Sequence, residues 1–215
     1  MGWLVVGLYA AALVLVAITT TDGDLRPGDR PDDGTAAEEL IEAWERSRTA
    51  TFLRSGTFER RSDVTGAVIA SEDILAQRPP RRLHRQLGGV SGRDDDQIVV
   101  CPAQPAGGDD VECRVGDPGG PTYAEDVAAE LAGLHSILEG PAPLYAVGRA
   151  REEGCFELAQ MHSEPRAPFG TEARFCFDAA TGAPIDSRVR YEGGQVEVVA
   201  VTEIRAEVTV GDLRP

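Results

Sequence analysis

The stretch that decides the fold spans residues 173–194 and reads ARFCFDAATGAPIDSRVRYEGG. Its first half alternates, so Phe175 and Phe177 share one face of an extended chain, while Cys176 lies on the other face with charged neighbours. A period of two is typical of a β-strand with one buried face. The stretch therefore predicts a strand whose aromatic side chains point toward a core.

The same alternation occurs in GCFELAQ, residues 154–160, where Phe156 and Leu158 point one way and Cys155 points the other. Pairing the two strands as an antiparallel hairpin gathers the phenylalanines and Leu158 on one face. It also brings Cys155 next to Cys176 on the opposite face. The aromatic residues thus form the buried face, and the cysteines fix the strand register from the opposite face.

The chain has four cysteines, which allow three disulfide connectivities. We favour Cys101–Cys113 and Cys155–Cys176, because each pair closes a local loop. Loops of this size stabilise a fold by roughly 3 kcal/mol each. A zinc site and free buried thiols are the alternatives. The zinc site has little support, because no CxxC motif occurs and the histidines show no ligand spacing: His84, His135 and His162.

The formal net charge of −15 argues against nucleic acid or an anionic membrane surface as a binding partner, because both would repel the chain. Lysine and asparagine are both absent from the sequence. Their absence excludes a Schiff-base lysine, a P-loop lysine and N-glycosylation.

Residues 3–18, WLVVGLYAAALVLVAI, carry no charge. With their neighbours they span about 20 residues, near the length that crosses a bilayer. We predict an N-terminal membrane anchor over residues 1–21, in a single-pass cell-membrane protein whose C-terminal domain is extracytoplasmic, on the cell surface or the periplasmic side. A cleaved signal peptide is the competing interpretation, and a buried core helix is the third. The first two both place the rest of the chain in an oxidising compartment.

Residues 22–34, DGDLRPGDRPDDG, contain almost nothing apolar and predict a flexible acidic linker. We assign residues 35–215 to one folded domain. Its apolar residues recur at helical spacing over 36–48 and 123–138 and with a period of two elsewhere. The order is helix, about five strands, helix, and four or five strands. It predicts an α+β fold in which a broad antiparallel sheet wraps around the helices.

Motifs of enzymatic chemistry are absent: the chain has no GxSxG, HExxH, GxGxxG or Walker loop. The acidic run at residues 94–96 lacks the spaced oxygen ligands and closing glutamate of a calcium loop, so we interpret it as a solvated turn. No histidine base is visible beside Ser91, and His162 stands alone near a strand end. We therefore predict no enzyme, no catalytic residue, no metal and no cofactor.

At CFDAATGAPIDSRVRYEGG, residues 176–194, the sequence resembles the extracytoplasmic LolA/LppX-like superfamily. That group includes lipoprotein carriers, mycobacterial lipid-transfer lipoproteins and the amino-terminal domain of RseB-type regulators. The helix that runs into a long strand over residues 36–59 is similar to the group as well. The resemblance covers most of residues 35–210. It implies an open half-barrel around helices, with an apolar cavity that captures acyl chains or a lipidated partner.

Such a cavity would be lined by apolar side chains from both kinds of element. The strand candidates are Phe52, Phe58, Val68, Ile74, Leu83, Phe156, Leu158, Phe175 and Phe177. The helix candidates are Leu40, Trp44, Leu131 and Leu134. The alternative interpretation is that all of these residues form a dry core.

Three functions follow from these observations. The first is a membrane-anchored, extracytoplasmic binding protein for a lipid or the acyl chain of a lipoprotein. The second is an envelope regulatory or sensor domain, similar to the RseB type, that binds a partner protein. The third, with the least support, is an extracytoplasmic enzyme.

Overall fold

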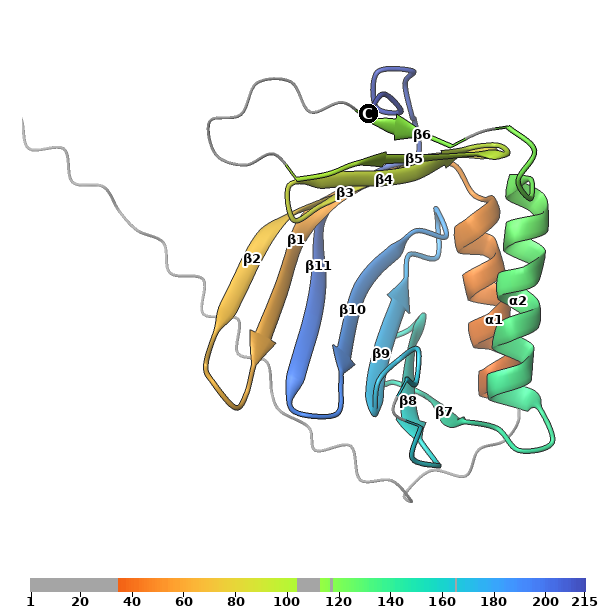
Figure 1. The fold of residues 1–215 in the computed structure, drawn as a ribbon. Helices are drawn as coiled ribbons and strands as arrows, with labels where there is room; N and C mark the ends of the chain where they lie inside the picture. The colour runs from red at the N-terminus through yellow and green to blue at the C-terminus, as the bar shows by residue number, and fades with distance from the viewer. Residues whose placement is uncertain (1–34, 104–112, 117, 165) are drawn as a thin grey trace, which may run out of the picture.

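The computed structural model describes residues 35–103, 113–116, 118–164 and 166–215. Within these ranges the chain forms two helices and eleven strands (Figure 1). The helices are α1 (Thr35–Thr49) and α2 (Tyr123–Glu139). The strands are β1 (Phe52–Ser62), β2 (Val68–Arg78), β3 (Arg81–Gln86), β4 (Gly89–Asp94), β5 (Gln97–Cys101), β6 (Arg114–Val115), β7 (Tyr145–Arg149), β8 (Cys155–Gln160), β9 (Glu172–Phe177), β10 (Pro184–Arg190) and β11 (Gln195–Arg205).

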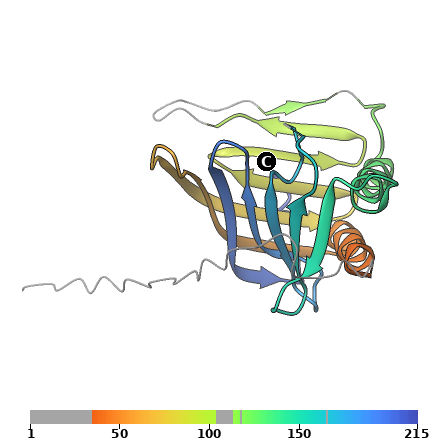
Figure 2. The same cartoon turned by 90° about the horizontal axis from the view of Figure 1, so that it is seen from below.

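All the strands belong to one sheet, in the order β6-β5-β4-β3-β2-β1-β11-β10-β9-β8-β7. Every pairing is antiparallel. The sheet bends so that β3–β6 and β7–β10 form two arms, and both helices stand across the open side between the arms (Figures 1 and 2). The predicted α+β half-barrel is therefore confirmed. We call the face turned toward the helices the concave face.

The β8–β9 pair has the register that the alternation predicts. Phe156 lies opposite Phe175, and Cys155 lies opposite Cys176. The phenylalanines belong to the core beneath the helices, and the cysteines form a disulfide on the convex face. The second predicted disulfide, Cys101–Cys113, is also present, and no cysteine of the described residues is free.

Both helices pack on the β7 arm of the sheet. The buried face of α1 includes Leu40 and Ile41, and α2 adds Leu134 and Leu138. Their partners are apolar side chains of four neighbouring strands: Tyr145, Val147, Phe156, Leu158, Ala173, Phe177 and Val189. The main hydrophobic core of the domain thus lies under the helices and against β7–β10.

Polar contacts hold the ends of the helices to the two arms. Arg149, at the end of β7, binds Glu39 in the first turns of α1 at 2.7 and 2.8 Å. At the other arm, Arg93 of β4 pairs with Asp126 of α2 at 3.2 Å. Thr122 caps α2 in a capping box, which satisfies backbone N–H groups that a helix start leaves unpaired. These contacts fix where each helix crosses the concave face.

The turn on which the family resemblance rests packs against the end of α1. Asp178 accepts hydrogen bonds from the backbone and hydroxyl of Thr181 at 2.7 and 2.6 Å. Gly182 has φ +72°, and a Cβ there would lie 3.4 Å from the Arg46 carbonyl oxygen. Ala183 is fully buried. The short, tight turn therefore lets the β9–β10 connection reach the interior.

The N-terminal anchor predicted over residues 1–21 and the linker over residues 22–34 lie outside the described residues. Neither helix in the described part of the chain has the length and apolarity needed to cross a bilayer.

We predict that replacing Cys155 and Cys176 together with serine lowers the free energy of unfolding by about 3 kcal/mol. The disulfide joins two cysteines that are 21 residues apart in the sequence, and its removal gives the unfolded chain more conformational entropy. Denaturant unfolding of the full chain, followed by circular dichroism, measures the change. A double variant that unfolds at the wild-type midpoint, with an unchanged slope, would contradict the prediction.

Candidate ligand-binding face

An aromatic cluster fills the space between α1 and the β7 arm. Trp44 of α1 lies 5.3 Å from Phe175 of β9 and 5.5 Å from Phe169 in the β8–β9 loop, measured between ring centroids. Phe169 lies 5.2 Å from Phe175 and 5.7 Å from Tyr145 of β7. Tilted and edge-to-face rings at such distances attract one another beyond the gain from burial. These four residues are called the aromatic cluster below.

Three rings of the aromatic cluster are less buried than the core beside them, whereas Tyr145 is fully buried. Trp44, Phe169 and Phe175 are only partly buried, whereas Leu158 is fully buried. Trp44 also directs its indole N–H outward to Glu130 of α2, at 3.0 Å. The cluster therefore forms the accessible margin of the core.

The structure brings most of the predicted lining residues together on the concave face. On the β7 arm and the helices, one set is buried in the core: Leu40, Leu134, Phe156, Leu158 and Phe177. A second set is partly buried and packs against that core: Trp44, Leu131 and Phe175. Phe52 and Phe58 lie on the concave face of β1 and are buried there. None of these positions contradicts the dry-core alternative by itself.

Three predicted lining residues lie on the other face of the sheet. Ile74 pairs with Ser55 and Val68 with Arg61, so both point away from Phe52 and Phe58. Leu83 lies opposite Ala76 on that same convex face and packs with Val99 and Cys101. The prediction was wrong for these residues because each strand was assigned a face separately. The relative registers of β1, β2 and β3 follow from pairing, which the period alone does not give.

The concave face of β1–β3 combines a small apolar cluster, in which Phe52 and Leu75 pack with Ala183, with buried polar side chains. The Asp73 carboxylate has no exposed surface, and it accepts a hydrogen bond from Arg54 at 2.5 Å. The other oxygen of Asp73 is 2.6 Å from His84 Nε2 and 3.0 Å from Gln86 Nε2. These four side chains, from three neighbouring strands, form the buried polar network.

Burial and hydrogen bonding act on the Asp73 pKa in opposite directions. Burial raises it, but the hydrogen bond from His84 and the charge of Arg54 together hold the pKa below the ordinary value of 3.8. Burial also lowers the pKa of Arg54, although the Asp73 charge partly opposes this. Asp73 is therefore held ionised at neutral pH, as a structural counter-charge for Arg54.

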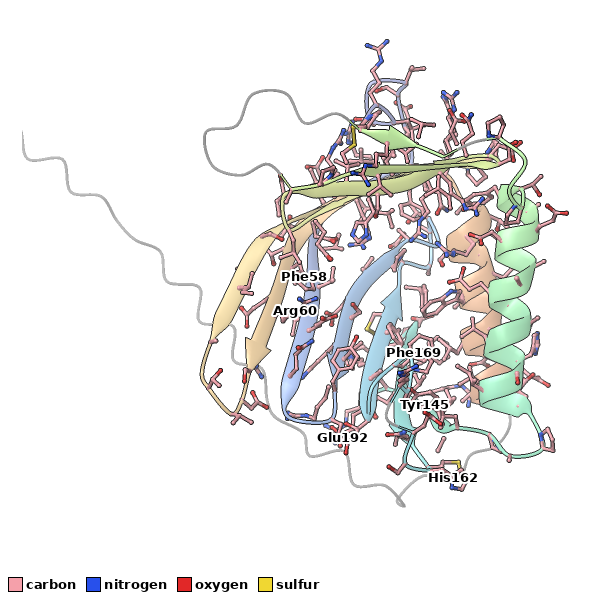
Figure 3. All side chains as sticks on the ribbon, viewed as in Figure 1. Phe58, Arg60, Tyr145, His162, Phe169 and Glu192 are labelled. Atoms are coloured by element: carbon pink, nitrogen blue, oxygen red, sulfur yellow. A yellow bond between two sulfur atoms is a disulfide. The ribbon has the colours of Figure 1, made fainter. Side chains whose placement is uncertain are left out.

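A second polar group lies near the open end of the half-barrel. Arg60 of β1 pairs with Glu197 of β11 at 2.8 Å, and its guanidinium carbon is 5.6 Å from the centre of the Phe58 ring. Figure 3 labels Phe58 and Arg60 on β1, with Tyr145 and Phe169 nearer the helices. The concave face thus has an aromatic side next to the helices and a charged side on β1–β3.

The buried polar network was not predicted from the sequence, although the face on which Arg54 lies could have been. Arg54 lies between Phe52 and Phe58 in the alternation, so a period of two already places it on the same face. Asp73 and His84 gave no such signal, because they meet only when β2 and β3 pair. Among the described residues no group of three or more His, Cys, Asp and Glu side chains is arranged to hold a metal ion.

A scan against protein-family models and a search of curated proteins match nothing. Among solved structures, the complex of MucA and MucB from Pseudomonas aeruginosa is 16% identical, with a TM-score of 0.49, over 84% of this chain and 61% of that chain. A crystal structure of MucB is 19% identical, with a TM-score of 0.47, over 86% and 64%. The chain thus spans about three fifths of the MucB length.

A LolA superfamily protein from Nitrosomonas europaea is 8% identical, with a TM-score of 0.33, over 84% of this chain and 98% of that chain. The half-barrel itself is established by the strand order and register of this chain.

We predict that Asp73→Asn lowers the free energy of unfolding by about 3–5 kcal/mol, because it leaves the buried Arg54 charge without its partner. Asp94→Asn is the matched control. Asp94 pairs with Arg81 on the surface, so its loss costs less than about 1 kcal/mol. Denaturant unfolding of both variants measures the difference, and equal losses would contradict the prediction.

The same pair of proteins tests the Asp73 pKa. Because folding lowers this pKa below 3.8, the stability that the carboxylate contributes is present above that pH and is lost as the pH falls through the folded value. We expect the difference in unfolding free energy between wild type and Asp73→Asn to shrink as the pH falls below about 4. Chemical unfolding at a series of pH values measures it. A constant difference down to pH 2 would refute the assignment.

Proposed function

We propose that this protein is an extracytoplasmic binding domain, held at the membrane by its N-terminal segment, that accepts a lipid or the acyl chain of a lipoprotein on its concave face. The domain binds and releases its ligand without chemical change. The apolar N-terminal segment and the two disulfides support a location outside the cytoplasm, because disulfides persist in oxidising compartments.

The observation that carries the proposal is that the two helices are too few to cover the whole concave face. Neighbouring strands lie about 4.8 Å apart, so eleven strands extend over about 48 Å along the curve of the sheet. Packed helices lie about 8–10 Å apart, so two helices cover only about four strands. The core agrees with this estimate, because the helices pack against side chains of β7–β10. No helix of the described residues packs over the rest of the concave face, although Phe52 and Leu75 at its centre are buried against the β9–β10 turn and Gln77 against the end of α1.

The aromatic cluster lies at the boundary of the covered region. A dry core would bury Trp44, Phe169 and Phe175 as fully as Leu158, yet these three rings stay partly accessible. Apolar contact with an acyl chain would remove that remaining surface from water. We assign the methylene chain of the ligand to these three rings.

A partner-binding role is the second candidate, and exposed apolar residues near the sheet edge favour it. Ile98 and Val100 on β5 are 51% and 44% exposed, next to the two-residue edge strand β6. The edge of a sheet presents backbone groups that can pair with another chain. A stoichiometric protein recovered with the full chain from membranes, in the absence of bound lipid, would favour this role.

Trp44 provides a direct test of acyl-chain binding. The chain has two tryptophans, so Trp3→Phe in the full chain leaves Trp44 as the only one. We expect a fatty acid brominated near the middle of its chain to quench Trp44 fluorescence saturably. We also expect Phe175→Ala to weaken binding by about tenfold or more, because burial of an aromatic side chain is worth about 1.5–3 kcal/mol.

Ile74→Ala is the control, because Ile74 is a partly buried apolar residue on the convex face. It should bind the brominated acid with wild-type affinity. Thermal unfolding by circular dichroism checks that both variants are folded. Absence of saturable quenching in the folded wild-type chain would rule out the acyl-chain site, and equal weakening by both substitutions would rule out its place at the aromatic cluster.

A further inference from the structure

Gln77 is a fully buried residue on the concave face of β2, close to the end of α1. Its amide nitrogen donates to the carbonyl oxygens of Ser47 and Ala50, at 2.6 and 2.8 Å. Both contacts require the nitrogen on that side, so the orientation of the amide is fixed. The amide oxygen then points elsewhere, and it has no hydrogen-bond partner among the described residues.

Arg82 is the direct neighbour of Gln77 across the β2–β3 pair. Its Nε atom is buried and lacks a hydrogen-bond partner in the described part of the chain. On its other side lies Arg93 of β4, a like charge, which makes the pair unfavourable. Asp126 of α2 balances the charge of Arg93 at 3.2 Å. No carboxylate of the described residues lies within ion-pair distance of Arg82.

Arg54 adds a third unsatisfied group to the same patch. It pairs with Leu75, two residues before Gln77 along β2, so Arg54 and Gln77 are diagonal neighbours. Its NH1 group binds Asp73, but its Nε atom is buried without a partner among residues 35–103, 113–116, 118–164 and 166–215. Buried polar groups are rarely left unpaired, because each such group costs free energy. Arg54 is paired with Asp73, so of the two arginines Arg82 is the one without a carboxylate partner in the described part of the chain.

We propose that Arg82, beside Gln77, forms the binding site for an anionic head group, a carboxylate or a phosphate. Arginine suits this role, because its planar guanidinium donates paired hydrogen bonds to both kinds of oxyanion. The oxygen of Gln77 adds an acceptor for a hydroxyl group beside the anion. The proposal rests on the acyl-chain function above and names the class of ligand that the concave face takes.

The head-group site lies next to the aromatic cluster. Gln77 binds the carbonyl of Ser47, and Ser47 in turn donates its hydroxyl to the carbonyl of Trp44, at 2.6 Å. Trp44 and Ser47 are three residues apart on α1, which is a rise of about 4.5 Å. The part of α1 that Gln77 contacts therefore lies about one helical turn from Trp44, and Arg82 lies one strand beyond Gln77.

The test compares a brominated fatty acid with its methyl ester, using Trp44 quenching in the full chain that carries Trp3→Phe. We expect the chain with the wild-type Arg82 to bind the acid at least tenfold more tightly than the ester. Arg82→Gln should abolish this preference while leaving ester binding unchanged. Arg81→Gln is the matched control, because Arg81 is the adjacent, exposed arginine on β3, and it pairs with Asp94. It should keep the preference.

The outcomes separate the two proposals. Equal binding of acid and ester by the wild-type chain, or an unchanged preference in Arg82→Gln, would overturn the head-group site while leaving acyl-chain binding intact. Absence of quenching by either compound would overturn both. A third titration with a brominated phosphatidylglycerol identifies the source of the anion: tighter binding than the free acid indicates a phospholipid phosphate, and weaker binding indicates a carboxylate.

Discussion

The domain depends on two helices that bridge the arms of a bent sheet. α1 is held to β7 by Arg149 and to β2 by Gln77, whose amide binds two carbonyls at the helix end. α2 packs on the β7 arm through Leu134 and Leu138 and is held at β4 through Asp126 and Arg93. Because each helix contacts strands far apart in the sheet, the curvature of the sheet and the position of the helices cannot change independently. The shape of the concave face follows from these contacts.

The position of the helices explains why the concave face is aromatic on some strands and more polar on others. Beneath the helices, apolar side chains of β7–β10 have helix residues to pack against, and the face is aromatic. On β2, Gln77 binds backbone carbonyls at the end of α1, and the Arg54–Asp73 pair is buried on the same face with His84 and Gln86. A buried ion pair contributes little net stability, but breaking it is costly, so it fixes the arrangement of these three strands.

The sequence was sufficient for those features that depend on local periodicity. The helices, the β8–β9 register and both disulfides follow from spacings within short segments. The half-barrel came from the resemblance carried by the CFDAATG turn. Features that depend on the register between distant or adjacent strands were missed. Val68, Ile74 and Leu83 are apolar at the expected period, yet pairing puts them on the convex face. Asp73 and His84 acquire their roles only when β2 meets β3.

The two parts of the proposed site both depend on α1, so binding at either part acts on this helix. α1 contributes Trp44 to the aromatic cluster, and its last carbonyls fix the amide of Gln77 beside Arg82. A ligand that contacts both parts would hold the C-terminal half of α1 against β2 and β9 together. The N-terminal half of α1 directly follows the predicted linker and binds β7 through Arg149. In the proposed function, α1 therefore connects the bound ligand with the predicted linker and membrane anchor.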